Sequence, residues 1–217
     1  MNYKIREIRS HEYLLLSQFL YEAIFIPEGS TPPPKTIISL PELQVYIKDF
    51  GKKHGDQGMV VEIDNKIVGA AWVRIMNDYG HIDNKTPSLA MSLYKEYRGY
   101  GIGTALLEGL LTKLRHSKYA KVSLSVQKAN YAVKMYQKVN LKSTRHFPAC
   151  SHNFPKAGEA RFQGLSRLFR LLGKFPYLGE SRRILMAVSS KTSSKTRFYY
   201  AATRRISSAA VQPSIWA

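Results

Sequence analysis

Three glycines at alternate positions, between a short apolar run and a long amphipathic pattern, constrain this 217-residue chain more than any other feature. The segment consists of Arg98, Gly99, Tyr100, Gly101, Ile102, Gly103 and Thr104. Glycine removes side chains from a turn, so a ligand can approach the backbone closely. The first N–H groups of a following helix lack partners within it, and the helix dipole favours negative charge there. The segment therefore predicts a phosphate site, with Arg98 as a cation beside it.

Two common phosphate-binding motifs fit this spacing poorly. A dinucleotide-binding fold needs G-x-G-x-x-G and an acidic residue about 20 residues later. Here the spacing is G-x-G-x-G, and no Asp or Glu lies between Glu108 and Glu159. A P-loop needs Gly-Lys-Ser/Thr, but Gly103 is followed by Thr104 and Ala105. Glycines that serve only tight packing remain a structural alternative.

The hydrophobic pattern predicts an α/β fold. Strands are expected at residues 3–9, 57–63, 67–76, 88–93 and 121–126, and helices at 11–26, 40–50, 101–116 and 130–139. The third helix carries an apolar residue at every fourth position: Ile102, Leu106, Leu110 and Leu114. This order predicts a mixed sheet flanked by helices, in which the strands at 88–93 and 121–126 are parallel.

The glycine segment, its flanking strands and helix, and Asn130 followed six residues later by Tyr136 resemble the GNAT superfamily of acetyl-CoA-dependent N-acetyltransferases. The family signature is Q/R-x-x-G-x-G/A, and Arg98, Gly101 and Gly103 fill its fixed positions. The resemblance covers about residues 3–141. It implies a GNAT-like acyltransferase fold, a central mixed twisted sheet flanked by helices. It also implies acetyl transfer from acetyl-CoA to a primary amine, and a sheet that splays between 88–93 and 121–126 to admit the pantetheine arm.

The resemblance further implies where the coenzyme binds. Backbone N–H groups of residues 98–104 would hold the pyrophosphate. The main chain of Met91, Ser92 and Leu93 would pair with the pantetheine arm, as an added strand pairs with a sheet edge. The Leu93 N–H would also donate to the thioester carbonyl oxygen.

Two residues of the last predicted helix complete this implied site. Asn130 would contact the pantetheine, and Tyr136 would protonate the departing thiolate. Each has a structural alternative: Asn130 can be a plain helix cap, and Tyr136 can belong to the core beside Val133 and Val139.

The general base is not apparent, because the strand at 88–93 contains no acidic residue or histidine. We expect Glu28, in the loop at 27–34, to take this role, with His81 and Asp83 as the other candidates. Each of them can instead be a solvated loop residue. The acceptor pocket is expected to draw on four aromatic residues that can equally be core residues. They are Tyr21, Phe25, Trp72 and Tyr79.

Charge divides the chain at about residue 145. The net charge is +18; residues 1–145 hold 21 basic and 13 acidic residues, whereas residues 146–217 hold 12 and 2. We therefore expect a GNAT domain at 1–145 and a poorly ordered or atypical basic extension at 146–217. An alternative function follows: a catalytically impaired coenzyme-A-binding module whose basic tail contacts nucleic acid or an anionic membrane surface.

The pattern beyond residue 141 departs from the family, which continues with two further strands. Two prolines, Pro148 and Pro155, and many small residues argue against a hairpin in residues 142–159. Only 186–190 and 197–201 are candidates for short strands. A replaced or frame-shifted terminus would leave the strand at 121–126 with an unpaired edge.

A few further expectations come from what the sequence lacks. A single cysteine, Cys150, excludes an internal disulfide, and the scattered histidines lack metal-ligand spacing, so no metal is expected. The first residues form no apolar signal region, and no run approaches the roughly 20 apolar residues of a membrane span. A cytoplasmic location is therefore predicted. Since many family members are dimers, the resemblance also allows a homodimer.

Overall fold

The computed structural model describes residues 1–78, 81–147 and 183–189. Its strands are β1 (Lys4–Glu7), β2 (Gln57–Ile63), β3 (Lys66–Arg74), β4 (Ser88–Leu93), β5 (Lys121–Gln127), β6 (Lys142–Phe147) and β7 (Arg183–Ser189). Its α-helices are α1 (Leu16–Glu22), α2 (Pro41–Gln44), α3 (Ile102–His116) and α4 (Ala132–Lys138). Short 3₁₀ helices occupy Ser10–Leu15, Lys35–Ser39 and Lys95–Tyr97. No helix among these residues is long and apolar enough to span a membrane.

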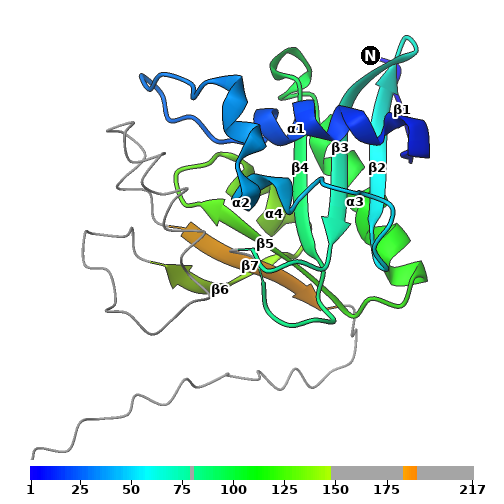
Figure 1. The fold of residues 1–217 in the computed structure, drawn as a ribbon, viewed down its shortest axis with the longest axis vertical. Helices are drawn as coiled ribbons and strands as arrows, with labels where there is room; N and C mark the ends of the chain where they lie inside the picture. The colour runs from blue at the N-terminus through cyan, green and yellow to red at the C-terminus, as the bar shows by residue number, and fades with distance from the viewer. Residues whose placement is uncertain (79–80, 148–182, 190–217) are drawn as a thin grey trace, which may run out of the picture.

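The strands form one mixed sheet in the order β1-β2-β3-β4-β5-β7-β6 (Figure 1). β1 to β4 are antiparallel, β4 and β5 are parallel, and β7 lies antiparallel between β5 and β6. The predicted mixed sheet and its parallel pair are therefore confirmed. The tight turn between β2 and β3 comes from Asp64 and Asn65, which both have positive φ, as a two-residue type I′ hairpin requires.

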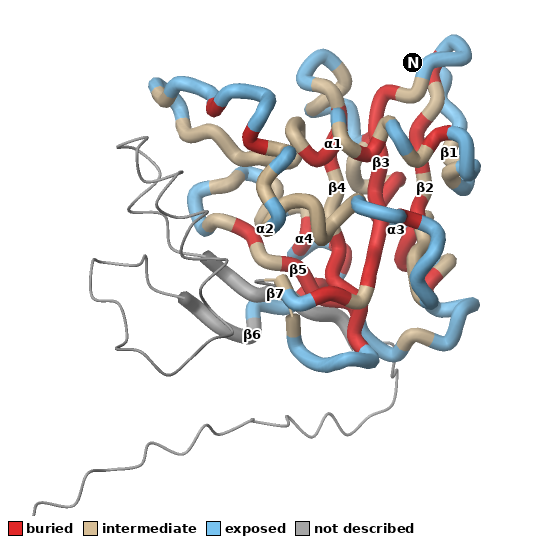
Figure 2. The backbone as a smooth tube through the Cα atoms, viewed as in Figure 1, coloured by how far each residue is buried: buried red, intermediate tan, exposed pale blue. Residues whose placement is uncertain are grey.

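Helices cover both faces of the sheet, and each face has its own core (Figure 2). On one face the stripe of α3 packs against alternate residues of the strands, such as Val61, Val73 and Leu124. On the other face Phe19 and Leu20 of α1 pack against Trp72. This division follows from the alternation of side chains along a strand. All four predicted stripe residues of α3 are buried.

The first two helices are shorter than the sequence predicts. The helix expected at 11–26 is a 3₁₀ helix followed by α1, which ends at Glu22. The helix expected at 40–50 is α-helical only over Pro41–Gln44. Its later carbonyls serve buried side chains instead: Arg74 Nη1 donates to Val45 O and Lys48 O, at 3.1 and 2.7 Å. A carbonyl used in this way is a poorer acceptor for the helical ladder, so the segment continues as turns.

The end of the sheet corrects the expectation that the residues directly after 141 form no strand. β6 pairs with β7, and β7 pairs with β5 from Lys121 to Gln127, so β5 is not an edge strand. Strand formation depends on an available pairing partner more than on local alternation, which is why the pattern of 142–147 gave no signal. The candidate strand at 186–190 overlaps β7, whereas Cys150 and the candidate at 197–201 lie outside the described residues. The division of the chain at residue 145 stays a prediction.

Asn140 and Leu141 follow the end of α4. Asn140 has φ of 64°, the left-handed conformation that glycine usually supplies at a helix end. Leu141 is 1% exposed and fills the core beside Val139.

The buried ion pair between Arg74 and Asp56 should be essential to this arrangement. Their side chains are 0% and 1% exposed and 2.7 Å apart, and Asp56 also accepts from Gly51 N–H. Asp56→Ala leaves a buried guanidinium without its counter-ion, so we expect a loss of about 3–5 kcal/mol in the free energy of unfolding, measured by denaturant titration. Lys52→Ala removes the exposed pair with Asp49 and should leave the free energy of unfolding almost unchanged, because exposed ion pairs contribute little. Equal losses in both variants would contradict this role.

Candidate active site

Strands β4 and β5 lie next to each other in the sheet but separate almost at once. Their parallel pairing consists of one register pair, Ser88 with Ser123, whereas β3 and β4 pair over six residues. Beyond that point the strands diverge toward their carboxyl ends. The splay expected between 88–93 and 121–126 is therefore present.

Every second residue of β4 points its main-chain N–H and C=O groups toward this gap. Successive residues of a strand point their N–H and C=O groups to opposite neighbours. Tyr94 N–H donates to Val68 O at 3.0 Å, and the register places Ser92 opposite Ala70. The polar groups of Ser92 therefore face β3, while those of Met91 and Leu93 face the side of β5. Because β5 has diverged there, the N–H groups of Met91 and Leu93 have no strand partner within the described part of the chain.

The three glycines after β4 have different structural roles. Gly99 and Gly101 have φ of 89° and 80°, a conformation that strains any side chain, and nothing lies within 4 Å of the position a Cβ would take. At Gly103 a Cβ would lie 3.3 Å from Met135 Sδ and 3.4 Å from Leu93 Cδ1. Gly99 and Gly101 thus shape an open turn, and Gly103 lets α3 approach β4 and α4.

This turn presents a run of free amides. Arg98 N–H donates to Lys95 O and Thr104 N–H to Gly101 O, at 3.2 and 3.0 Å. Between them the N–H groups of residues 99–103 have no acceptor among the described residues. They stand at the start of the 15-residue helix α3, where the helix dipole favours an anion. The arrangement suits the two phosphates of a coenzyme.

The side chain of Arg98 has partners that the sequence does not predict. Its Nε donates to Leu93 O at 2.8 Å, and its Nη2 lies 3.1 Å from Glu22 Oε2. Arg98 therefore ties the end of β4 to the end of α1 while remaining beside the glycine turn. Glu22 is a residue of this site that sequence reasoning missed, since nothing in the helix pattern separates it from a solvated carboxylate.

Asn130 lies two residues before α4, and Tyr136 lies within the helix. The N-cap residue of α4 is Tyr131 rather than Asn130, but Asn130 Oδ1 accepts a hydrogen bond from Ala132 N–H at 2.9 Å and so supports the first turn of the helix. Tyr136 is buried in the core on the α3 face of the sheet. Burial, with a smaller contribution from Tyr131, raises the pKa of Tyr136 above its usual value. The hydroxyl therefore keeps its proton at any physiological pH, as a proton donor must.

The three candidates for the general base lie in different places. His81 and Asp83 belong to the loop before β4, about 17 Å along this six-residue strand from Leu93. Desolvation acts to raise the pKa of Asp83, but hydrogen bonds from Lys85 and Thr86 outweigh it and lower that pKa, which makes the carboxylate a weaker base. Glu28 is exposed in the loop that follows α1.

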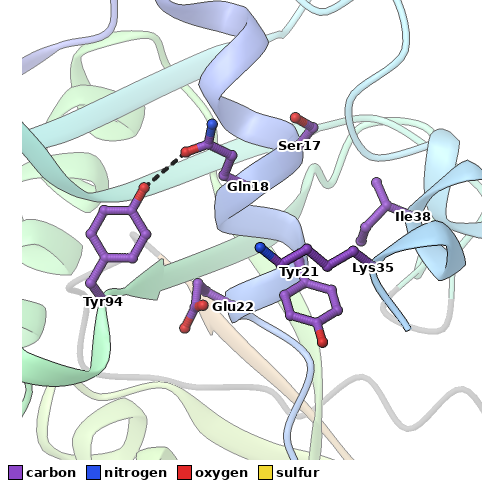
Figure 3. A pocket seen from close by; sticks show the side chains of 7 residues that line it. All are labelled: Ser17, Gln18, Tyr21, Glu22, Lys35, Ile38 and Tyr94. Carbon is purple, nitrogen blue, oxygen red and sulfur yellow. Dashed lines mark hydrogen bonds between the residues drawn. The ribbon is translucent and has the colours of Figure 1, made fainter. Parts of the chain in front are cut away.

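A cleft of about 620 Å³ lies along α1 close to Arg98 and the end of β4 (Figure 3). It is lined by Ser17, Gln18, Tyr21, Glu22, Lys35, Ile38 and Tyr94. Tyr94 Oη donates to Gln18 Oε1 at 2.9 Å across one side of the helix. Of the predicted acceptor aromatics, Tyr21 lines this cleft. Trp72 does not, because it is fully buried and donates to Tyr46 O; Phe25 is half-buried, and Tyr79 lies outside the described residues.

No group of three or more His, Cys, Asp or Glu side chains in the described ranges is placed to hold a metal ion. The site is therefore made of main-chain amides, a buried tyrosine and a small number of polar side chains. Such a set can hold an anionic carrier, stabilise charge on a carbonyl oxygen and supply one proton.

Known proteins are similar to this chain in sequence and in fold. Residues 20–140 match the model of the acetyltransferase (GNAT) family. The N-alpha-acetyltransferase of Saccharolobus solfataricus is 30% identical over 119 residues, which cover 50% of this chain and 71% of that protein.

Solved structures share the fold at lower sequence identity. The ribosomal-protein-S18-alanine N-acetyltransferase of Escherichia coli superposes with a TM-score of 0.55 at 12% identity, covering 91% of this chain and all of that one. A Salmonella typhimurium protein solved with its cofactor acetyl-CoA superposes at 0.54 and 12% identity, covering 89% and 96%.

The glycine turn is tested by Gly101→Asp, which adds a strained side chain and a negative charge where the phosphates are expected. Loss of two charge-assisted hydrogen bonds, at about 1.5 kcal/mol each, should weaken acetyl-CoA binding about 100-fold in a calorimetric titration. Gly29→Asp is the matched control, because Gly29 also has positive φ and open space around it. Undiminished binding by Gly101→Asp would contradict the assignment.

Proposed function

Since the chain belongs to the acetyltransferase (GNAT) family, we propose that it transfers the acetyl group of acetyl-CoA to a primary amine, and that this amine is the α-amino group of a polypeptide. The general activity, acetyl transfer to nitrogen with acetyl-CoA as co-substrate, is that of the family. The acceptor class is supported by the relative from Saccharolobus solfataricus, which is named for transfer to α-amines.

One observation carries this proposal: two sets of unpaired main-chain groups are adjacent, one in the glycine turn and one at the end of β4. The N–H groups of residues 99–103 form an anion site at the start of α3, and the adjacent gap exposes the main chain of Met91 and Leu93. A long carrier with phosphates at one end and amides along its arm satisfies both sets together. A short anion such as free phosphate would satisfy only the first.

The chemistry then follows from the direction of each group. Leu93 N–H points into the gap, where it can donate to the thioester carbonyl oxygen as negative charge develops on it. Arg98 fixes the Leu93 carbonyl and so limits rotation of this part of the strand. Tyr136, which is protonated and buried in the core on the α3 face, is the donor we assign to the leaving thiolate. An uncharged amine is needed for attack, and Glu28 is the residue we propose to take the proton, directly or through water.

A second candidate function has a specific observation behind it. β4 contains no acidic residue or histidine, and His81 and Asp83 lie at its far end. If Glu28 does not act as a base, the chain is a coenzyme-A-binding module with little transfer activity.

One assay separates the two candidates: release of free thiol from acetyl-CoA in the presence of a peptide with a free N-terminus, with mass spectrometry of the peptide. Transfer supports the enzyme, whereas acetyl-CoA binding without peptide acetylation supports the binding module.

Tyr136→Phe keeps the ring in the core and removes only the proton donor. We expect kcat to fall about 10- to 100-fold, less than many general-acid losses because a thiolate is a good leaving group. The KM for acetyl-CoA should stay unchanged. Tyr131→Phe, at an exposed tyrosine next to α4, should leave both constants unchanged. If Tyr136→Phe retained full kcat, Tyr136 would be a core residue only.

The pH profile gives a separate test. Because the pKa of Tyr136 is raised, the donor stays protonated beyond the usual tyrosine pKa of about 10. The value of kcat should therefore rise or stay level between about pH 7 and 9.5, as the acceptor amine loses its proton. A descending limb within this range that disappears in Tyr136→Phe would show a lowered pKa and contradict the assignment.

A further inference from the structure

Two polar atoms on β5 are buried and have no hydrogen-bond partner among the residues that the structure describes. They are Ser125 Oγ and Gln127 Oε1. A buried polar atom without a partner costs free energy, and such atoms are rare in folded proteins. Two of them two residues apart on one strand therefore call for a common explanation.

Their position on the sheet is determined by the alternation of β5. Val122, Leu124 and Val126 belong to the core on the α3 face, so Ser125 and Gln127 point to the opposite face, where α1 lies. Both come after the last pairing of β5 with β4, at Ser123. Counted from that pair, Gln127 is level with Ser92 and one residue short of Leu93. The two side chains thus border the gap beside the proposed oxyanion donor.

This face is where a second substrate would approach. The pantetheine arm pairs in the plane of the sheet with Met91 and Leu93, and Tyr136 belongs to the core on the α3 face. A molecule that meets the thioester from the α1 face passes over Ser125 and Gln127. Both side chains are uncharged, so they suit a neutral partner rather than a second ammonium or a carboxylate.

We infer that Ser125 and Gln127 bind the first peptide group of the acceptor, so that the chain is selective for polypeptide α-amines over amines without an amide. The inference rests on the proposed function. Gln127 Oε1 accepts from the peptide N–H, and the Ser125 hydroxyl donates to the peptide carbonyl. Residues i and i+2 of a strand are about 7 Å apart, a separation that one peptide group bridges with a hydrogen bond of about 2.9 Å at each end.

The test compares a peptide acceptor with its ester analogue, in which the first peptide N–H is replaced by oxygen. The wild type should show a KM about 10-fold higher for the ester, as expected for one lost hydrogen bond. Gln127→Ala should raise the KM for the peptide about 10-fold and should no longer distinguish the two acceptors, while the KM for acetyl-CoA stays the same. Equal KM values for both acceptors in the wild type would overturn the inference. A changed KM for acetyl-CoA in Gln127→Ala would also overturn it, because it would show that Gln127 binds the coenzyme.

Serine variants on the same face of β5 give an independent readout. Ser125→Ala removes an unpartnered hydroxyl, so the melting temperature should stay level or rise although the KM for the peptide increases. Ser123→Ala is the matched control: Ser123 is fully buried and has a partner, so its loss should lower the melting temperature by about 2–4 °C without changing peptide selectivity. A comparable fall for Ser125→Ala would show a structural role and overturn the inference.

Failure of the proposed function would be recognised separately. Titration of the peptide and of its ester into the complex with coenzyme A measures binding without transfer. Selective peptide binding without acetylation would contradict the proposed function and support this inference. Acetylation of the peptide without selective binding of the peptide over its ester would support the proposed function and contradict this inference.

Discussion

The proposed function of this molecule depends on an interruption of main-chain pairing between β4 and β5. A sheet normally satisfies the N–H and C=O groups of each inner strand on both sides, and unsatisfied groups are costly when buried. Here the two strands share one register pair and then diverge. The edge of β5 that faces away from the gap is fully paired with β7. Within the described part of these two strands, main-chain groups therefore stay unpaired only where β4 and β5 face each other. What remains open is a strip of β4 main chain that a ligand with its own amides can complete.

Arg98 makes this open strand end a defined site. A strand that has lost its neighbour is free to twist, which would move Leu93 N–H. The Arg98 guanidinium donates to the Leu93 carbonyl and to Glu22 on α1, so one side chain joins the end of β4 to the end of α1. The cation expected beside the phosphates is thus engaged in positioning, and in the proposed function the amides of residues 99–103 bind the anion.

The parts of the fold that local chemistry dictates were predictable. The glycine turn, the stripe of α3, the Asp64–Asn65 turn and the left-handed Asn140 each depend on a few adjacent residues. The parts that depend on distant partners were not. Residues 45–50 leave the helical pattern because Arg74 and Trp72, far along the chain, take their carbonyls, and β6 forms because β7 is available. In the site, Ser125 and Gln127 gave one signal that could have been used: polar residues alternating on a strand expected to be covered on both faces.

Amide hydrogen exchange, followed residue by residue with and without acetyl-CoA, tests the central claim most directly. The account predicts that acetyl-CoA protects the amides of Met91, Leu93 and residues 99–103. The amide of Ser92, which already faces β3, should change little, so neighbouring residues of one strand should respond differently. Uniform protection along β4, or protection that omits the glycine turn, would show that the coenzyme does not complete the open edge of the sheet.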